Sequence, residues 1–321
     1  MTSFKRFVLS LVLLAPLAVF AQEASYPDRP IRLVVPAAPG GGQDFISRMV
    51  AEQMSKDWGQ PVVVENKAGG SGIIGSDLVA KAKPDGYTIM IQSFQHATNP
   101  SLHKILPYDT LKDFTAISTV ASQGLVVTFN PNIPANSIKE FIALAKANPG
   151  KYNYASGGLG SSQHLFAELF VRTAGIDVVH VPYGGIAPGM MAVVTGDTAF
   201  MFNQVSTSLP NIKAGKLKAL AFTGKEPSPL LPGVPTLDSS LPGFEARTWF
   251  AMFGPAGMSK ALVDKISAEV AHIMRLPAVK ERLAGMGVDG IGNTPEQAQA
   301  FNDAEAAKWA KHVSSWGIKA K

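Results

Sequence analysis

The sequence predicts an α/β protein made of two doubly wound lobes, which two crossovers join and a central cleft separates. Three observations favour this fold. Strand-like apolar runs alternate with stretches of helical periodicity along most of the chain. Glycine-rich segments stand where predicted strands give way to helices. Of the 321 residues, 300 follow a leader-like start, which is more than the roughly 100–200 residues of a single domain.

The first part of the chain predicts a β-α-β-α-β unit. Residues 31–35 are an apolar run typical of a buried strand, and apolar residues then recur at helical spacing as far as Trp58. Pro84-Asp85-Gly86 is a turn that separates the second helix from the third strand. The predicted elements are strand 31–35, helix 45–58, strand 62–64, helix 73–83 and strand 87–91.

A second sheet of the same kind is predicted further along the chain. Its strands are expected at 125–129, 152–155, 177–181, 199–202 and 217–222. Its helices are expected at 137–147, 161–174, 186–195 and 205–214. The segment 227–242 is rich in proline and lacks periodicity, so it should run irregularly over the surface.

The remaining elements predict that the chain returns to the first sheet. A strand is expected at 249–253, followed by helices at 259–274 and 295–314. The last helix opens with the capping box Thr294-Pro295-Glu296-Gln297. Crossovers are predicted near Ser122 and Thr248. They divide the chain into lobe 1, residues 26–122 with 248–321, and lobe 2, residues 123–247.

Residues 1–21 have the anatomy of a cleaved secretory signal. Lys5 and Arg6 precede an apolar stretch, and Val19 and Ala21 are small enough for the pockets of signal peptidase. The apolar stretch of 14 residues is shorter than the roughly 20 that cross a bilayer. The chain has no cysteine that could carry a lipid anchor. We therefore expect a soluble periplasmic monomer that is not lipid-anchored.

Composition excludes several classes of function. Without cysteine there are no disulfides, thiolate metal sites or cysteine nucleophiles. The formal charge of +5 falls to +3 when Lys5 and Arg6 are removed, and the lysines are dispersed, so nucleic acid is not an expected partner. The six histidines lack metal-ligand spacing, and neither a metal nor a cofactor is expected. A mildly positive protein suits a small anionic ligand.

Three glycine-rich loops stand at predicted strand-to-helix junctions. They span residues 39–44, 69–72 and 156–162. At such a junction the first backbone N–H groups of the helix are unpaired and carry about half a positive charge, so they can bind an anion without any arginine. Ligands of open α/β sheets bind at the carboxyl ends of the strands, where these loops should lie.

The sequence of these loops allows two other interpretations. Residues 70–75 match GxGxxG, but the strand that follows lacks the acidic residue of a dinucleotide site. Ser161 or Ser162 with His164 could serve an exported hydrolase, although the chain has no GxSxG nucleophile elbow. A ligand-sensing protein that docks a signalling partner is a third alternative.

The candidate ligand-binding residues come from the loops and from the predicted strand ends around the cleft. Phe94 is the strongest aromatic candidate because it directly follows a strand, and Arg247 is the guanidinium expected nearest the cleft. The full set is Pro39, Gly40, Gly41, Gln43, Asp44, Ser71, Ser93, Phe94, His96, Ser156, Gly158, Gly160, Ser161, Ser162, His164, Tyr183, Gly184, Asn203 and Trp249.

Ordered blocks over nearly the whole mature chain resemble the substrate-binding proteins of tripartite tricarboxylate transporters, also called the Bordetella uptake gene (Bug) family. They include PIRLVVPAAPGGGQD, YASGGLGSSQHL, HVPYGG and LLPGVPTL. The resemblance implies a non-enzymatic "Venus flytrap" of the type II periplasmic binding protein kind, which hands a carboxylate to membrane permease subunits. It also implies that the carboxylate lies between loop 39–44 and loop 156–164.

The chain departs from this family's pattern at three positions. An acid is usual in the block that matches residues 196–203, but Ala199 and Asn203 stand there. Lysine is common where this chain has Gly184. Because the loss of a carboxylate removes a partner for an ammonium group, we expect a dicarboxylate or aromatic carboxylate as ligand, with Phe94 stacking on it, rather than an amino acid.

Overall fold

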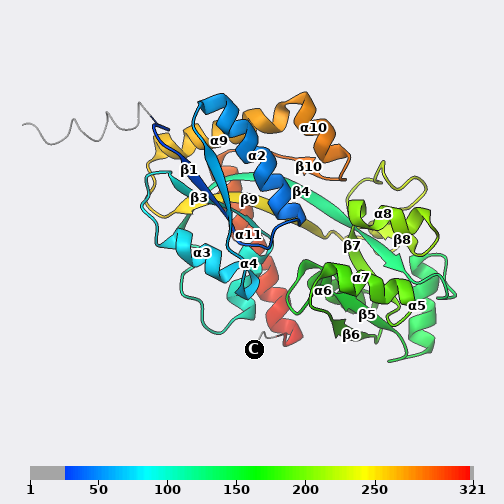
Figure 1. The fold of residues 1–321 in the computed structure, drawn as a ribbon. Helices are drawn as coiled ribbons and strands as arrows, with labels where there is room; N and C mark the ends of the chain where they lie inside the picture. The colour runs from blue at the N-terminus through cyan, green and yellow to red at the C-terminus, as the bar shows by residue number, and fades with distance from the viewer. Residues whose placement is uncertain (1–25, 319–321) are drawn as a thin grey trace, which may run out of the picture.

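The structure is a computed structural model that describes residues 26–318, and the predicted signal peptide lies outside the described residues. Two α/β halves lie side by side, and long strands run between them (Figure 1). This mixed α/β architecture is the fold class that the sequence predicts. Within residues 26–318, no helix is long and apolar enough to cross a bilayer.

The sheet of lobe 1 has a parallel part and an antiparallel part. β1 pairs in parallel with β2 and with β3, while β9 runs antiparallel to both β3 and β4. The short β10 adds to β4. The strands are β1 (Ile31–Val35), β2 (Val62–Asn66), β3 (Thr88–Ser93), β4 (Phe114–Phe129), β9 (Arg247–Pro255) and β10 (Asp289–Gly290).

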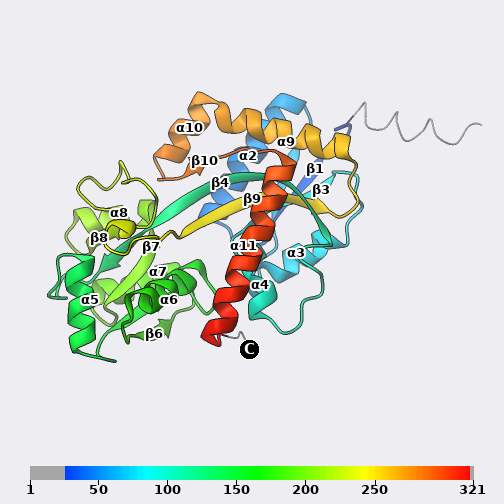
Figure 2. The ribbon, with the colours of Figure 1, turned by 180° about the vertical axis from the view of Figure 1, so that it is seen from behind.

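Alternating side chains of this sheet enter two separate cores. Leu33 of β1 packs with α2 and α9 on one face, whereas Val34 packs with α3, α4 and α11 on the other. Figures 1 and 2 show these helices on opposite faces of the sheet. The helices are α2 (Gly42–Trp58), α3 (Ile73–Ala80), α4 (Gln95–Leu102), α9 (Lys260–Arg275), α10 (Pro277–Ala284) and α11 (Pro295–Trp316).

Lobe 2 repeats the alternation of strands and helices around a smaller sheet. β5 pairs in parallel with β6 and β7, and both β7 and β8 run antiparallel to β4. The strands are β5 (Asn153–Ser156), β6 (Val179–Pro182), β7 (Phe200–Gln204) and β8 (Lys218–Phe222). The helices are α5 (Ile138–Ala147), α6 (Ser162–Ala174), α7 (Ile186–Thr195) and α8 (Val205–Lys213).

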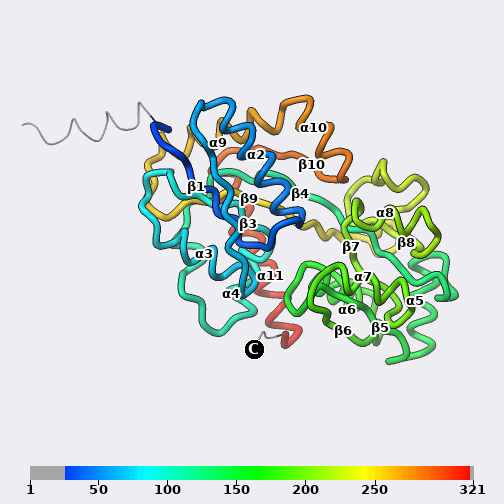
Figure 3. The backbone as a smooth tube through the Cα atoms, viewed as in Figure 1, coloured from blue at the N-terminus to red at the C-terminus, as the bar shows by residue number. Residues whose placement is uncertain are grey.

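Strand β4 passes from one lobe into the other. It pairs with β9 as far as Gly124, which lies opposite Arg247, and it pairs with β7 and β8 from Leu125 onward. Figure 3 shows the chain entering lobe 2 along β4 and returning just before β9. The change of partner supports the predicted lobe boundaries near Ser122 and Thr248, which stay predictions.

Helices α4 and α10 and the two-residue strand β10 were not predicted from the sequence, and β4 was predicted only in part. Only 125–129 of β4 was expected to be a strand, because polar residues such as Ser118 and Gln123 interrupt the apolar pattern, although both are buried. Helix α4 contains Pro100 and mostly polar residues. Helix α10, residues 277–284, follows α9 after a single connecting residue and was not predicted.

Three aromatic rings join the lobes. Phe94 of lobe 1 lies edge-on to Phe166 of lobe 2, with ring centroids 5.2 Å apart, and it also lies 4.9 Å from Trp309. Phe166 stacks on Trp309 at 5.6 Å. All three side chains are almost fully buried, so this apolar contact belongs to the core that the two lobes share.

Candidate ligand-binding site

The loop between β1 and α2 presents an uncapped helix start. Gly41 precedes the helix in an extended conformation, with φ −86° and ψ 171°, and no side chain caps the first turn. Pro39, Gly40 and Gly41 are exposed. The first backbone N–H groups of α2 have no acceptor within the helix, so they remain available to an anion.

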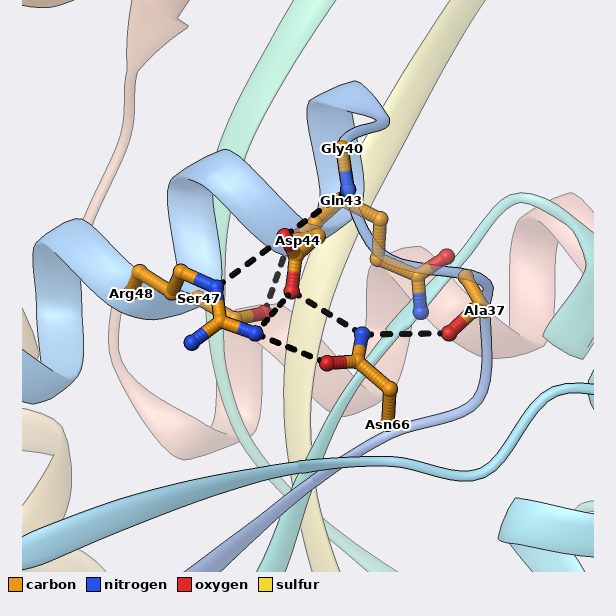
Figure 4. Close-up of polar contacts among 7 residues, drawn as sticks. All are labelled: Ala37, Gly40, Gln43, Asp44, Ser47, Arg48 and Asn66. Carbon is orange, nitrogen blue, oxygen red and sulfur yellow. Dashed lines mark hydrogen bonds and ion pairs between the residues drawn. The ribbon is translucent and has the colours of Figure 1, made fainter.

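Asp44 braces this loop from inside, as Figure 4 shows. Its carboxylate accepts hydrogen bonds from the Gly40 N–H at 3.0 Å, Arg48 Nε at 3.0 Å and Asn66 Nδ2 at 2.9 Å. Burial favours a raised pKa, but the bonds from Arg48, Gly40 and Asn66 outweigh it and lower the pKa of Asp44. The side chain is only 7% exposed. Asp44 therefore holds the loop in shape and presents no free carboxylate to a ligand.

Gln43 also points into the protein rather than toward solvent. Its Nε2 donates to the backbone oxygen of Ile91 at 2.8 Å, and the side chain is buried. The predicted contact between the Gln43 side chain and a ligand finds no support in this geometry. The backbone N–H of Gln43 lies in the first turn of α2, next to the loop.

The second glycine loop, 69–72, packs against the base of the first. A Cβ on Gly72 would lie 3.0 Å from the backbone oxygen of Pro36, so only glycine fits there. Ser71 adopts the left-handed conformation with φ 56°, and its backbone oxygen accepts a hydrogen bond from Asn99 Nδ2 at 3.1 Å. Non-glycine residues in this conformation cluster at ligand clamps. Ser71 is exposed, as a contact residue must be.

The third loop, between β5 and α6, is held by its own hydroxyl groups. Ser161 caps α6 by accepting from the His164 N–H, and its hydroxyl donates to the Gly158 backbone oxygen at 2.7 Å. Ser156 accepts from the Gly158 N–H at 3.1 Å. Gly158 and Gly160 have φ values of 120° and 78°, which favour glycine. These bonds preorganise the loop and leave Ser162 at the first turn of the helix.

His180, which the sequence analysis did not select, completes this loop. Its Nε2 lies 2.7 Å from the Ser156 hydroxyl oxygen, and its ring stacks on His164 with centroids 4.0 Å apart. Burial and the neighbouring His180 lower the pKa of His164 to about 3. Burial lowers the pKa of His180 to about 4 against the opposite effect of Glu168. Both imidazoles are therefore neutral at pH 7.

No spacing in the sequence could reveal this contact. His180 follows Ser156 by 24 residues, and the two meet because β5 and β6 pair in parallel with Tyr154 opposite His180. Tyr183, three residues beyond His180, donates its N–H to the Ser156 backbone oxygen at 3.1 Å. Tyr183 is half-buried, whereas Gly184 is exposed.

The first and third loops both lie where the lobes meet. A Cβ on Gly42, at the start of α2, would lie 3.3 Å from Gln204 Nε2 of lobe 2. A Cβ on Gly160 would lie 2.7 Å from a methyl carbon of Leu102 in lobe 1. Each loop thus approaches the opposite lobe. Gln204, at the carboxyl end of β7, is a further candidate that the sequence analysis passed over in favour of its neighbour Asn203.

Several predicted contact residues are buried away from the loops. Phe94 packs on Phe166 and Trp309, so no ring face is open for a ligand to stack on. His96 is 1% exposed and lies against Phe253 and Phe114, with centroids 4.2 and 5.0 Å away. These two residues serve the core in this conformation.

Four more candidates form hydrogen bonds or ion pairs with residues outside the glycine loops. They are Trp249, Asn203, Ser93 and Arg247. Trp249 Nε1 donates to Glu305 at 3.1 Å. Asn203 Nδ2 donates to Thr128 at 2.8 Å, and the side chain is fully buried. Ser93 is buried and its hydroxyl donates to Gln95. Arg247 pairs with Asp289 and contacts Ser122. Ala199 lies just before β7, at the end opposite Gln204, so its identity does not bear on the loops directly.

The hydrolase alternative lacks the hydrogen bond between serine and histidine that it requires. A serine nucleophile needs a hydrogen bond to its base, but the Ser161 hydroxyl donates to Gly158 and His164 Nδ1 instead accepts from the Gly160 N–H at 3.1 Å. The part of the chain that the structure describes also contains no group of three or more histidine or acidic residues able to hold a metal ion.

The chain matches the family model of TctC, described as the tripartite tricarboxylate transporter family receptor, over residues 46–318. It is 35% identical to the protein BugT of Bordetella pertussis, over 92% of each chain.

Three solved structures have the same fold over nearly the whole chain. Rpa4515 of R. palustris with adipate is 31% identical, with a TM-score of 0.83 over 92% of this chain and 100% of that one. The periplasmic binding protein BugD is 35% identical, with a TM-score of 0.79 over 92% and 100%. MatC of Rhodopseudomonas palustris with bound malate is 29% identical, with a TM-score of 0.78 over 90% and 100%.

These matches confirm the predicted fold and the resemblance found in the sequence. They also place the chain among solute-binding receptors, a non-enzymatic kind of protein, which removes the hydrolase alternative. The chain belongs to the TctC, or Bug, family of tripartite tricarboxylate transporter receptors.

Proposed function

We propose that this receptor works in the periplasm, where it captures a small dicarboxylate or aromatic carboxylate without an ammonium group and delivers it to the permease subunits of a tripartite transporter. The observation that carries the proposal is the uncapped start of α2, which lies against Gln204 of the opposite lobe. A ligand at this point contacts both lobes, so its binding favours their closure. The adipate and malate in the structures of two relatives support a carboxylate ligand.

Backbone donors are sufficient for such a ligand. The N–H groups at the start of α2 carry a fixed partial positive charge, and loop 156–162 is already ordered by the Ser156 and Ser161 hydroxyls. When the lobes close, the lower local dielectric strengthens each hydrogen bond to the carboxylate. Preformed donors also reduce the entropy lost on binding.

The charges on the two loops argue against an amino-acid ligand. Within segments 36–44 and 156–164, Asp44 is the only acidic residue. Its carboxylate is occupied by Arg48, Asn66 and the Gly40 N–H. An ammonium group in the cleft would lose its hydration without gaining a free carboxylate from these loops, which is unfavourable.

Matched ligand pairs test the charge argument most sharply. Calorimetric titration of the mature chain, residues 22–321, should compare adipate with L-2-aminoadipate and malate with L-aspartate, since each pair differs mainly by an ammonium group. We expect the acid without the ammonium to bind at least about tenfold more tightly in the pair that fits the cleft. Benzoate tests the aromatic class in the same titration. Tighter binding of either amino acid would contradict the proposed ligand class.

The transport role needs a separate measurement. Uptake of the labelled ligand into cells that express the permease subunits should depend on this receptor. A sensor would bind the same ligand and compact in the same way, but its removal would leave uptake unchanged.

A further inference from the structure

A cavity separate from the glycine loops lies on the reverse side of the connecting strands. Its volume is about 550 Å³, and both lobes line it. Leu169 and Thr173 of α6 form one wall, Phe301 and Lys308 of α11 face them, and segment 242–245 contributes a third side. None of the three glycine loops lines it. Figure 2, seen from behind, shows α11 on the near side, whereas the start of α2 faces the viewer in Figure 1.

The base of this back cavity contains two aromatic rings. Trp249 and Phe301 lie edge to face with centroids 5.4 Å apart. Beside them, Glu305 is 8% exposed, and its carboxylate accepts from Trp249 Nε1 at 3.1 Å and from Trp309 Nε1 at 3.2 Å. Lys308 adds a third donor to Glu305. The one buried acid of the lining is thus hydrogen-bonded by two indole N–H groups and paired with the Lys308 ammonium.

Two cationic side chains, Lys308 and Arg247, line the rest of the cavity, and each is also paired with a carboxylate of the protein. The Lys308 side chain is 44% exposed, so its ammonium can reach a ligand as well as Glu305. Arg247 and His312 line the same space. Burial lowers the pKa of His312, and the nearby Lys308 and Lys311 lower it further, so the charged form of this imidazole is disfavoured. The remaining acid, Glu245, is exposed and lies 3.6 Å from Lys225.

We propose that the back cavity binds a small organic anion with a flat apolar part, such as an aryl carboxylate or aryl sulfonate, and that its occupancy depends on the angle between the lobes. The volume falls within the roughly 300–1,000 Å³ of small-molecule sites. Phe301, which is partly exposed and packs on the buried Trp249, contacts the ring, and Lys308 pairs with the acid group. Because α6 and α11 belong to different lobes, a hinge motion changes the width of the cavity.

Occupancy of the back cavity is therefore coupled to ligand binding at the glycine loops. This coupling rests on the proposed function, since it requires the carboxylate at the loops to change the hinge angle. Linkage then demands that each ligand change the affinity of the other by the same factor. Binding to the back cavity itself does not depend on the loops.

The probe for this site is 8-anilinonaphthalene-1-sulfonate, an aryl sulfonate whose fluorescence rises in apolar surroundings. Titration of the folded mature chain should give a single saturable site. Lys308→Gln removes the cation and Thr173→Trp narrows the cavity from α6. We expect Lys308→Gln to weaken binding about fivefold and Thr173→Trp to weaken it at least about tenfold. Lys311→Gln is the matched control: it removes the same charge from α11 at a residue that does not line the cavity.

Gly42→Pro separates the two sites. It removes a backbone donor from the start of α2 and should leave binding of the probe unchanged. Binding at the back cavity can therefore be measured even if the function proposed for the glycine loops is wrong. The inference is overturned if wild type shows no saturable binding, if neither Lys308→Gln nor Thr173→Trp weakens it, or if Gly42→Pro abolishes it. Circular dichroism of each variant verifies that the chain is folded.

Discussion

The hydroxyl oxygen of Ser156 lies 2.7 Å from Nε2 of His180, which ties the end of β5 to the neighbouring strand β6 inside the third glycine loop. The His180 ring also stacks on His164 at 4.0 Å and on Tyr154 at 4.8 Å. One side chain thus supports the loop by a hydrogen bond and by packing.

His180→Ala should destabilise the protein because it removes both kinds of support. We expect the free energy of unfolding in urea to fall by about 1–3 kcal/mol. His272→Ala is the control, since its side chain is 52% exposed and lies 3.9 Å from Asp57. That change should cost less than about 0.5 kcal/mol. Equal effects of the two substitutions would argue against the role of His180.

Stability should fall when the pH is lowered from 7.5 to 5. The folded protein holds His164 and His96 at pKa values of about 3 and His180 at about 4, whereas an unfolded histidine titrates near 6.5. Below pH 6.5 the unfolded chain therefore binds more protons, and the stabilising contribution, complete above that pH, is progressively lost as the pH falls toward the folded pKa values of about 4 and about 3. Each histidine should account for up to about 2 kcal/mol at pH 5. Urea unfolding at both values measures this difference, and equal stabilities would contradict it.

His96→Phe should remove part of that pH dependence without harming the receptor. Both ring nitrogens of His96 are buried and have no hydrogen-bond partner among residues 26–318. Replacing them by carbon removes an uncompensated desolvation cost of about 1–3 kcal/mol, so stability at pH 7.5 should be equal or higher. Ligand affinity should stay within about twofold. Loss of ligand binding in a folded variant would contradict this prediction and show that His96 belongs to the ligand-binding site.

Gly184→Lys should strengthen the binding of a dicarboxylate. A Cβ at this position meets no atom within 4 Å, so the side chain can be added without a clash. An exposed charge of this kind contributes about 0.2–1 kcal/mol, which corresponds to a gain of up to about fivefold. The gain should shrink at high salt because exposed charges are screened. Gly184→Gln is the neutral control, and an equal gain for both variants would show that charge is not the cause.

The sequence could predict the loops but not what their side chains do. Loop positions follow from local signals: an apolar strand, then glycine, then helical spacing, as at Gly40 and Gly158. Asp44 and Gln43 belong to such a loop and yet point inward, because Asp44 accepts a hydrogen bond from Asn66 and Gln43 donates one to Ile91, both on other strands.

The surroundings of the residues near the loops are set by tertiary contacts even more than those of the loop residues themselves. Phe94 follows a strand as expected, but its ring is enclosed by Phe166 and Trp309, which lie more than 70 and 200 residues further along the chain. Trp249 turns toward Glu305 on the reverse side. His180 and Gln204 reach the loops only through the pairing of β5, β6 and β7, for which a single sequence carries no local signal.

In the proposed site, backbone N–H groups at the start of α2 are the carboxylate donors, and a pair of substitutions at Gly42 tests this directly. Proline is suited to the first position of a helix, and the extended Gly41 before it is compatible with proline. Gly42→Pro therefore removes the N–H while keeping the helix, whereas Gly42→Ala adds a Cβ and keeps the N–H.

Calorimetric titration with adipate, or with whichever acid of the panel binds wild type most tightly, should compare the two variants. We expect Gly42→Ala to stay within about threefold of wild type and Gly42→Pro to bind at least about tenfold more weakly, with similar unfolding free energies. Equal affinity of a folded Gly42→Pro and Gly42→Ala would contradict the claim that this helix start holds the ligand.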